Sequence, residues 1–279
     1  MTKILKKIAR FLPSPLINTL VRIKNARYGW HGNFLSWKDA QAASSGYDKD
    51  VIIEKVKQAT QQVINGEAVF ERDSMLFYEE DFSWPLINGF MYVAAQKEGK
   101  LNVLDFGGSL GSARLQYRKF FEPLSVKWGV VEQEKFVAAG KILFPDGPVA
   151  FYADVDTCLL HQQPDLLLLG SVLQYMEYPY TFLEDLLQKN FEFLIIDKTP
   201  LLLEAPDRLT VQKVPPYIYD ASYPAWLLNK TKVFEQVKKY YDQVFEYTDL
   251  FETNIKGCVY TGACFKRKAV QENRKPNNL

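Results

Sequence analysis

Hydrophobic residues gather in short runs between residues 102 and 196, and stretches with helical spacing separate the runs. The runs predict five strands, at 102–105, 126–132, 149–152, 165–169 and 191–196. Most of these runs are apolar throughout rather than alternating with polar residues, which is typical of parallel strands covered on both faces. Stretches at 111–121 and 134–142 have the apolar spacing of helices that pack on a sheet. The alternation predicts an α/β fold with a mostly parallel sheet and helices on both of its faces.

The segment before this alternation is predicted to form a helical cap. Apolar stripes run over 47–64 and 84–95, and the second of these helices would lead into the first strand. Region 28–82, which is rich in aromatic residues, would then cover a ligand site on the sheet. Together with the basic start of the chain, the cap makes up a first predicted unit, 1–95.

The segment after the fifth predicted strand has a less regular pattern. Residues 201–230 are dense in Pro, Tyr and Ser, which predicts a structured loop beside a substrate. Two short runs at 244–248 and 259–267 predict an antiparallel hairpin that completes the sheet. The domain that holds the sheet would span 96–267, with 201–230 as an insertion, and 268–279 would be a disordered tail.

A glycine-rich turn joins the first predicted strand to a helix. Such a junction presents backbone N–H groups and a helix N-terminus to a ligand. The dinucleotide pattern G-x-G-x-x-G fits at one of its three positions when it starts at Gly107. The pattern acid-x-Gly-x-Gly-x-Gly of S-adenosylmethionine (SAM) methyltransferases fits at Asp105, Gly107 and Gly111, with Ser109 in the middle glycine position. A carboxylate suits the cationic end of SAM and would repel a pyrophosphate; the alternative is an ordinary glycine-rich turn.

Other polar residues follow the predicted strands and would meet at the same edge of the sheet. Glu132 ends the second strand about 20 residues past the glycine turn, the ribose-binding position of such folds. Its alternative is a solvated acid at a strand end. Asp154 follows the third strand, where an acid would face the adenine amino group, and Asp156 competes for that role. The remaining predicted cofactor-binding residues are Gly108, Gln133, Ser171 and Gln174.

Methyl transfer to a hydroxyl needs a base, and the sequence offers several. The candidate catalytic residues are His31, Asp73, Tyr175 and Asp197, and the pattern does not rank them. The predicted acceptor-binding residues are Arg72, Lys198, Tyr223 and Trp226. Aromatic faces with scattered hydroxyl groups would suit a small-molecule or glycan acceptor. The alternative is that these aromatic residues pack the cap onto the core.

Composition excludes several classes of site. The 279-residue chain is 47% hydrophobic, which is enough for a sizeable core, and its net charge of +1 gives no reason to expect a nucleic-acid partner. Cys158, Cys258 and Cys264 have no paired spacing, which argues against a disulfide framework and a zinc site. Two histidines, His31 and His161, are too few for a His-rich metal centre. No metal is therefore expected.

The start of the chain is basic, since residues 1–38 contain neither Asp nor Glu. If 2–12 is helical, its apolar residues share one face, which is typical of a segment that lies on an anionic membrane surface. Weak peripheral contact of residues 1–24 with the inner membrane is one expectation; the other is a helix docked on the domain with its lysines in water. No apolar run of 18 residues occurs, so a cytoplasmic protein is expected. The sequence leaves the oligomeric state open.

An ordered set of motifs extends over residues 28–265. The set is YGWHGNFLSWKDA at 28–40, GYD at 46–48, ERD at 71–73, VLDFGGSLG at 103–111, VVEQ at 130–133, SVLQY at 171–175, DKTP at 197–200 and SYPAW at 222–226. Taken together, these motifs resemble a family of SAM-dependent methyltransferases found among bacterial surface-polysaccharide genes, such as those for O-antigen and capsule. The resemblance implies a Rossmann-like class I SAM-methyltransferase sheet, a SAM cofactor and, less directly, O-methylation of a sugar or other polar group. Lys198 stands where Arg is common in the family, and a lysine would bind an anionic acceptor group without the bidentate geometry of arginine.

Two rival functions remain open at this stage. An NAD-dependent sugar-modifying enzyme would need the dinucleotide glycine spacing and a Tyr-x-x-x-Lys pair after the fourth strand, and the chain has neither. A non-catalytic SAM-fold binding protein would have no reason to keep both the Asp105 turn and Glu132.

Overall fold

The computed structural model describes residues 27–46, 49–218, 220–249 and 253–269. The predicted amphipathic segment at 2–12 and nearly all of the predicted tail at 268–279 lie outside these residues. In the described ranges, no helix is long and apolar enough to cross a membrane.

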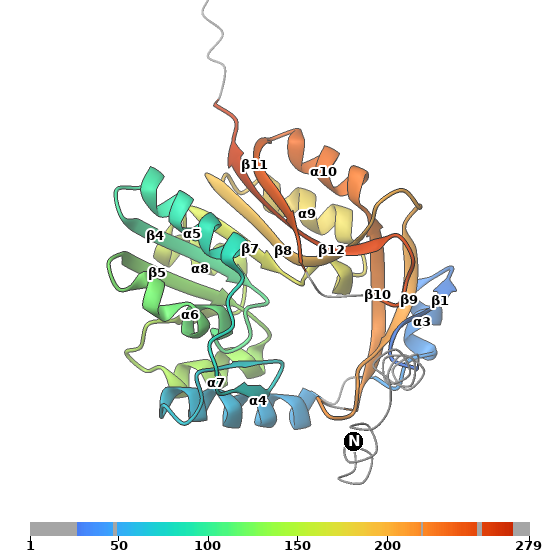
Figure 1. Cartoon of the computed structure of the whole chain (residues 1–279), viewed down its shortest axis with the longest axis horizontal. Coiled ribbons are helices and arrows are strands. Elements are labelled where there is room, and N and C mark those ends of the chain that lie inside the picture. The colour runs from blue at the N-terminus through green and yellow to red at the C-terminus, as the bar shows by residue number, and fades with distance from the viewer. Residues whose placement is uncertain (1–26, 47–48, 219, 250–252, 270–279) are drawn as a thin grey trace, which may run out of the picture.

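The central sheet has the order β6-β5-β4-β7-β8-β12-β11 (Figure 1). Its strands are β4 (Lys100–Phe106), β5 (Ser125–Val131), β6 (Ala150–Tyr152), β7 (Leu166–Gly170), β8 (Phe193–Leu202), β11 (Tyr241–Thr248) and β12 (Cys258–Arg267). Strands β4 to β8 run parallel, β12 is antiparallel to β8, and β11 is antiparallel to β12. The predicted architecture, an α/β fold with a mostly parallel sheet and an antiparallel C-terminal hairpin, is confirmed.

Helices cover both faces of this sheet because alternate residues of its strands point to opposite sides. In β7, Leu166 and Leu168 belong to one core, and Leu167 and Leu169 belong to the other. The first core includes residues of α4 (Lys49–Ile64), α5 (Trp84–Gln96), α6 (Ser112–Gln116) and α7 (Glu134–Leu143). The second includes residues of α8 (Val155–Gln162), α9 (Pro179–Leu187) and α10 (Lys230–Lys238).

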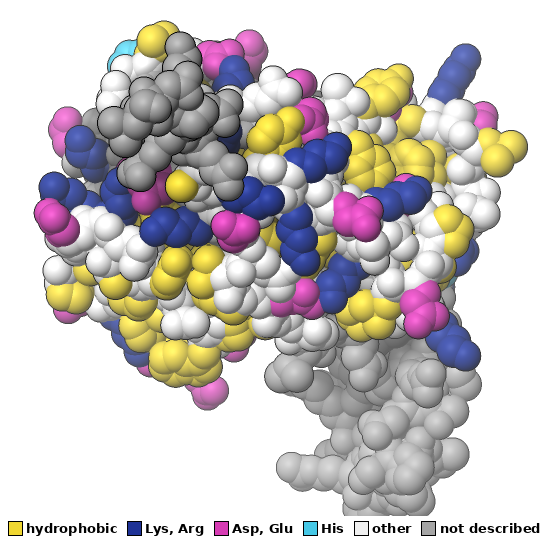
Figure 2. Space-filling view, turned by 90° about the horizontal axis from the view of Figure 1, so that it is seen from above, with side chains coloured by type: hydrophobic (Ala, Val, Ile, Leu, Met, Phe, Trp, Pro, Cys, Tyr) yellow, Lys and Arg dark blue, Asp and Glu magenta, His cyan; other side chains and the backbone are white. Residues whose placement is uncertain are grey.

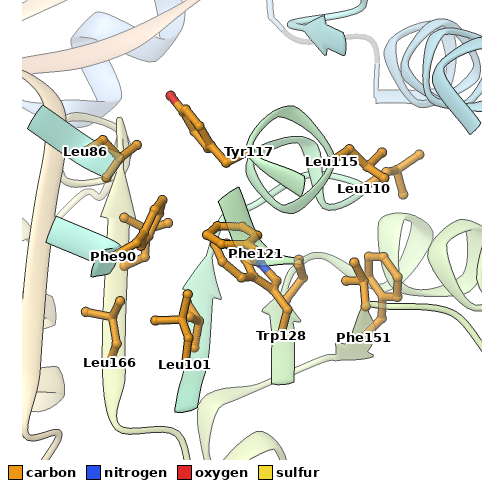
Figure 3. Close-up of a cluster of buried hydrophobic side chains, with 14 of the residues drawn as sticks. Leu86, Phe90, Leu101, Leu110, Leu115, Tyr117, Phe121, Trp128, Phe151 and Leu166 are labelled. Atoms are coloured by element: carbon orange, nitrogen blue, oxygen red, sulfur yellow. The ribbon is translucent and has the colours of Figure 1, made fainter. Parts of the chain in front are cut away.

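The first core centres on the aromatic rings of Phe90, Phe121 and Trp128, which Figure 3 shows close together. Phe90 packs edge-to-face on Trp128 and Phe121, with ring centroids 5.6 Å and 5.5 Å apart. All three rings are buried, and Phe90 has no exposed surface. This packing joins α5 and the short 3₁₀ helix η1 (Arg118–Phe121) to the middle of β5.

A second group of strands stands at the far side of the molecule from β4 and β5 (Figure 1). Its members are β1 (Gly29–Phe34), β9 (Arg208–Lys213) and β10 (Ser222–Asn229), with α3 (Trp37–Ala42) packed against them. β10 continues the main sheet through a short parallel pairing of Leu228 with Leu201 and Asn229 with Leu202.

The prediction of a loop over 201–230 is therefore wrong, because strands make up much of that segment. A proline usually disrupts a strand. Pro224, however, lies in the part of β10 that pairs with β9 and that precedes the residues pairing with β8. A proline is tolerated there because its missing N–H faces an open edge. The cap is likewise less helical than expected, since it contains β1 and a hairpin of β2 (Phe70–Arg72) and β3 (Met75–Phe77).

Charged side chains of both signs are mixed on the surface. On the face shown in Figure 2, Lys and Arg lie among Asp and Glu without a broad area of one sign. Among the ion pairs, Lys97 Nζ lies 2.8 Å from Asp165 and 2.9 Å from Glu192. These half-buried pairs contribute little to stability compared with the buried hydrophobic cores, which carry the fold.

Replacing Phe90 by Ala should lower the free energy of unfolding by about 3–5 kcal/mol, because it leaves a cavity among rings that cannot close over it. Leu160→Ala is the control, since Leu160 is 82% exposed and its loss should change stability by less than about 0.5 kcal/mol. Urea unfolding followed by circular dichroism measures both. A loss below about 1 kcal/mol for Phe90→Ala would contradict this view of the core.

Candidate functional site

A cavity of about 1420 Å³ opens at the carboxyl ends of the parallel strands. Its lining comes from β4 to β8, from the β2–β3 hairpin of the cap and from the β9–β10 segment. The predicted cofactor residues on its lining are Asp105, Gly107, Gly108, Ser109, Glu132, Gln133, Asp154, Ser171 and Gln174. The predicted catalytic and acceptor residues there are Arg72, Asp73, Tyr175, Asp197, Lys198 and Tyr223. One cavity thus brings together most of the residues that the sequence singles out.

The glycine turn leaves β4 and enters α6 with little space to spare. A Cβ on Gly108 would lie 2.4 Å from the carboxyl group of Asp105, so a side chain there would have to displace the acid. Gly111 is the N-cap of α6 with φ of 82°, a conformation that favours glycine. Gly111 does not line the cavity, so its role in the structure is to turn the chain into the helix.

Asp105 is buried beneath this turn and is only 3% exposed. Trp128 Nε1 donates a hydrogen bond of 3.2 Å to its carboxylate. Burial raises the pKa of Asp105 to about 7, and the nearby carboxylates of Glu132 and Asp197 act in the same direction. A cation that entered the cavity beside Asp105 would therefore be stabilised, and it would shift the carboxyl group toward its ionised form.

Glu132 ends β5 next to the glycine turn. Its carboxylate accepts a 2.8 Å hydrogen bond from the backbone N–H of Gln133 and another from the N–H of Ser109. Burial raises its pKa, and the two backbone bonds oppose that shift. The bonds fix the carboxylate at the cavity wall, where its remaining lone pairs can accept hydrogen bonds from hydroxyl groups of a ligand.

Asp154 also has a structural role at the start of α8, which was not predicted from the sequence. It is the N-cap of α8, and its two oxygens accept from the backbone N–H and the hydroxyl of Thr157 at 2.7 Å and 2.8 Å. These bonds lower its pKa, so the group is ionised. Asp154 also lines the cavity, and each capped oxygen retains a lone pair for a ligand.

Backbone strain is concentrated at the cavity. Asp73, Ser109, Ser171 and Lys198 all line it and have φ of 51°, 55°, 57° and 46°. Residues other than glycine rarely adopt such angles, and each costs on the order of 1–3 kcal/mol. Neighbouring bonds hold some of them; Ser171 Oγ, for example, donates 2.8 Å to the carbonyl of Lys198. Strain retained at several positions of one cavity indicates that the geometry there serves a function.

One part of the cavity lining, the tyrosine wall, consists of Tyr175, Tyr223 and the amide of Gln212. Tyr175 donates a 2.9 Å hydrogen bond to Gln212 of β9 and packs edge-on against Tyr223 of β10, with ring centroids 5.3 Å apart. Burial raises the pKa of Tyr175 to about 12, so this hydroxyl stays protonated at neutral pH. Trp37 and Gln41 of α3 also reach this wall. Such a surface presents aromatic faces and neutral hydrogen-bonding groups to a bound molecule.

Besides Gly111, two predicted residues lie away from the cavity lining. His31 is on β1, and its Nε2 lies 3.2 Å from the carbonyl of Tyr28. Trp226 packs among buried residues of the β9–β10 segment, and its Nε1 donates 3.3 Å to the carbonyl of Glu177. The structure therefore does not bring these two side chains to the residues that they were expected to join.

Several residues of the cavity lining were not predicted from the sequence. Glu71, Gln212 and Trp37 come from three separate parts of the cap and the second strand group. Glu71 belongs to the ERD motif, which was a usable signal, but its burial at 2% exposure depends on contacts with α6 that no local pattern encodes. Gln212 lies in a segment that was expected to be a loop.

The donor set of the cavity fits a cationic, hydroxyl-bearing ligand better than a diphosphate. Carboxylates stand at the glycine turn and at the end of β5, where a pyrophosphate would meet like charge. The amide oxygen of Gln174 is buried without a hydrogen-bond partner, so it is an acceptor that a ligand donor can satisfy. Among the described residues, no group of three or more His, Cys, Asp or Glu is arranged to hold a metal ion.

Gly108→Ala should lower the free energy of unfolding by about 1–3 kcal/mol, because the new methyl group would overlap the Asp105 carboxyl group. Gly170→Ala is a matched control from the same cavity, since a Cβ there meets nothing within 4 Å. The control should change stability by no more than about 0.5 kcal/mol. Urea unfolding compares them, and equal effects of the two substitutions would contradict the close approach of turn and acid.

Solved structures with a similar fold include three with bound S-adenosylhomocysteine (SAH). The N-terminal domain of EvdMO1, in the presence of SAH and D-fucose, is 16% identical with a TM-score of 0.47, covering 80% of this chain and 98% of that chain. The 1,6-didemethyltoxoflavin-N1-methyltransferase of Burkholderia thailandensis, with bound 1,6-didemethyltoxoflavin and SAH, is 12% identical with a TM-score of 0.42, covering 81% of this chain and 92% of that chain. The N-methyltransferase NodS of Bradyrhizobium japonicum, in complex with SAH, is 10% identical with a TM-score of 0.42, covering 77% and 99%. No protein-family model and no curated protein matches the chain, and at these identities the similarity concerns the fold alone.

Proposed function

We propose that this protein is a SAM-dependent methyltransferase that acts on a small polar acceptor. The observation that carries the proposal is the meeting of two acids with the glycine turn in one cavity. Asp105 lies under the turn and Glu132 ends the neighbouring strand, so both face the position where a nucleoside would lie. SAM combines an ammonium, a sulfonium and a ribose, and those are the groups that two such carboxylates can bind.

Each part of SAM has a partner in this assignment. Asp105 binds the ammonium end, Glu132 accepts from both ribose hydroxyls, and Asp154 accepts from the adenine amino group. Gly107 and Gly108 let the turn approach the ligand closely, and Gly108 in addition has no room for a side chain. Ser109, Gln133, Ser171 and Gln174 complete the lining on this side.

The cavity is larger than one ligand needs, and this supports a second molecule beside SAM. Binding pockets for small molecules usually measure roughly 300–1,000 Å³, and this one measures about 1420 Å³. The acceptor lies against Tyr175, Tyr223 and Gln212, whose rings and amide suit a neutral or weakly charged polar molecule. Arg72 and Lys198 border the same space. A sugar of surface-polysaccharide biosynthesis is the acceptor that the sequence motifs favour.

Catalysis in this assignment is mainly positioning. Bound SAM supplies an activated methyl group on a sulfonium, which is a good leaving group. The protein holds the acceptor in line with that group, keeps the tyrosine wall in a single arrangement through the Tyr175–Gln212 bond, and limits access of water. Weak contact of residues 1–24 with the inner membrane remains a separate prediction about location in the cell.

Glu132→Ala should weaken binding of SAM and SAH at least tenfold, because it removes two charge-assisted hydrogen bonds of about 1.5–3 kcal/mol each. Glu134→Ala is the control, since Glu134 is an exposed acid at the start of α7. Isothermal titration calorimetry measures both, with NAD as a second ligand that should not bind. Unchanged SAM affinity in Glu132→Ala, or binding of NAD in place of SAM, would contradict the proposal.

SAM affinity should fall as the pH drops below 7. Burial raises the pKa of Asp105 to about 7, so the group is neutral in acid, and the ammonium binds only its ionised form. Because one such group is mostly ionised at pH 7.5 and almost fully protonated at pH 5.5, the dissociation constant should increase about tenfold or more over that range. Asp105→Asn should bind weakly at both values and lose most of the pH dependence. Calorimetry at the two pH values decides this, and equal affinities of the wild type would refute it.

A further inference from the structure

We infer that Asp73 is the general base that takes the proton from an acceptor hydroxyl, and that Glu71 holds Asp73 in position. The inference rests on the proposed function and deepens it, because it makes the reaction an O-methylation. It also assigns a role to Glu71, a buried acid of the cap that no ligand-binding pattern predicts.

Of the other three candidate bases, two are held by hydrogen bonds and one lies off the cavity lining. His31 does not line the cavity. Asp197 is 3% exposed and accepts a 2.5 Å hydrogen bond from the hydroxyl of Tyr247. Tyr175 donates its own proton to Gln212 and has a pKa raised to about 12. A base must be deprotonated and open to the substrate, and none of these side chains meets both conditions.

Asp73 is open to the cavity, and two positive charges near it favour its ionised form. Loss of hydration inside the cavity raises the pKa of Asp73, while the positive charges of Arg72 and Lys198 oppose that rise. The titratable and charged groups that face it are Glu71, Arg72, Tyr175, Lys198 and Tyr260. A carboxylate more basic than usual accepts a hydroxyl proton more readily. Asp73 and Tyr175 line the same cavity and interact electrostatically, so Asp73 faces the space assigned to the acceptor.

The backbone at Asp73 is strained, and Glu71 supports it. Asp73 and Ser74 have consecutive φ values of 51° and 62°, although neither is glycine. The carboxylate of Glu71 accepts a 3.2 Å hydrogen bond from the backbone N–H of Ser74. The same carboxylate accepts a hydrogen bond from the hydroxyl of Ser112, the residue that follows the glycine turn. Glu71 therefore ties the strained turn that carries Asp73 to the loop where the cofactor would bind.

The chemical step balances without another reactant. The acceptor oxygen forms a bond to the methyl carbon as the carbon–sulfur bond breaks, and the electron pair of that bond stays on sulfur. The hydroxyl proton moves to Asp73, which returns it to water after the products leave. No oxidant or reductant is required.

Asp73→Asn tests the base directly, because it keeps the shape of the side chain and removes its basicity. The probes are a panel of free monosaccharides and nucleoside-diphosphate sugars, with SAH release as the rate and mass spectrometry to locate the methyl group on oxygen. The variant should bind SAM within twofold of the wild type by calorimetry, while kcat falls at least about 100-fold. Asp146→Asn is the control, since Asp146 is an exposed acid that does not line the cavity, and its kcat should stay near wild type.

Glu71 is tested by a graded pair of variants. In Glu71→Gln the amide oxygen can still accept from Ser74, so kcat should recover to within about tenfold of the wild type, whereas Glu71→Ala should lose about 100-fold. The pH profile separates positioning from general instability. The wild-type kcat should rise with pH as Asp73, whose pKa is raised, loses its proton. This rise should be absent in Asp73→Asn and present in Glu71→Gln.

The outcomes are distinguishable from failure of the proposed function. A wild type that does not bind SAM refutes the function itself. A wild type that binds SAM but methylates only nitrogen, or none of the hydroxyl probes, refutes the O-methylation inference alone. An Asp73→Asn variant that keeps more than a third of the wild-type kcat, or that loses SAM binding, also refutes the role of Asp73 as the base.

Discussion

The burial of one carboxylate, that of Asp105, is the constraint on which the rest of the site depends. A charged group in that position loses its hydration, so it is retained only where something compensates. Trp128 compensates in part, by donating a hydrogen bond from within the hydrophobic core. The carboxyl group of Asp105 also requires glycine at position 108, because a side chain there would overlap it. The electrostatics of the cavity and the conformation of the glycine turn therefore have the same origin.

A buried acid of the cap also holds part of the cavity lining in place. Glu71, a second buried acid with a pKa of about 7, connects the β2–β3 hairpin to the first residue of α6. Through it, the hairpin is held against the glycine turn rather than projecting from the domain. The tyrosine wall forms another part of the lining, where β9 and β10 extend the main sheet. A ligand at the strand ends would thus be enclosed by three parts of the chain that are distant in sequence.

The central sheet could be predicted because its information is local. Uninterrupted apolar runs such as Leu166–Gly170 identify buried parallel strands, and the ends of those strands fall at one edge by topology alone. Asp105 and Glu132 could therefore be assigned to one site without coordinates. The same reasoning failed for β9 and β10, because Pro224 and the many polar residues around it are typical of a loop and their pairing partners are remote.

Side-chain direction and remote contacts account for the other differences. His31 and Trp226 were grouped with the site by residue type, but the packing of β1 and β10 places them off the cavity lining. Glu71 was overlooked because its importance comes from Ser112, 41 residues away. Periodicity predicts which face of an element is buried, but it does not predict which remote segment covers that face.

The most direct test of the central claim is a crystal structure of the protein with SAH. The account predicts the ribose hydroxyls within hydrogen-bonding distance of Glu132 and the amino end of SAH beside Asp105. The sulfur should then point toward the space between Asp73 and Tyr175. SAH bound in another orientation, or at a site away from the carboxyl ends of β4 and β5, would contradict the account.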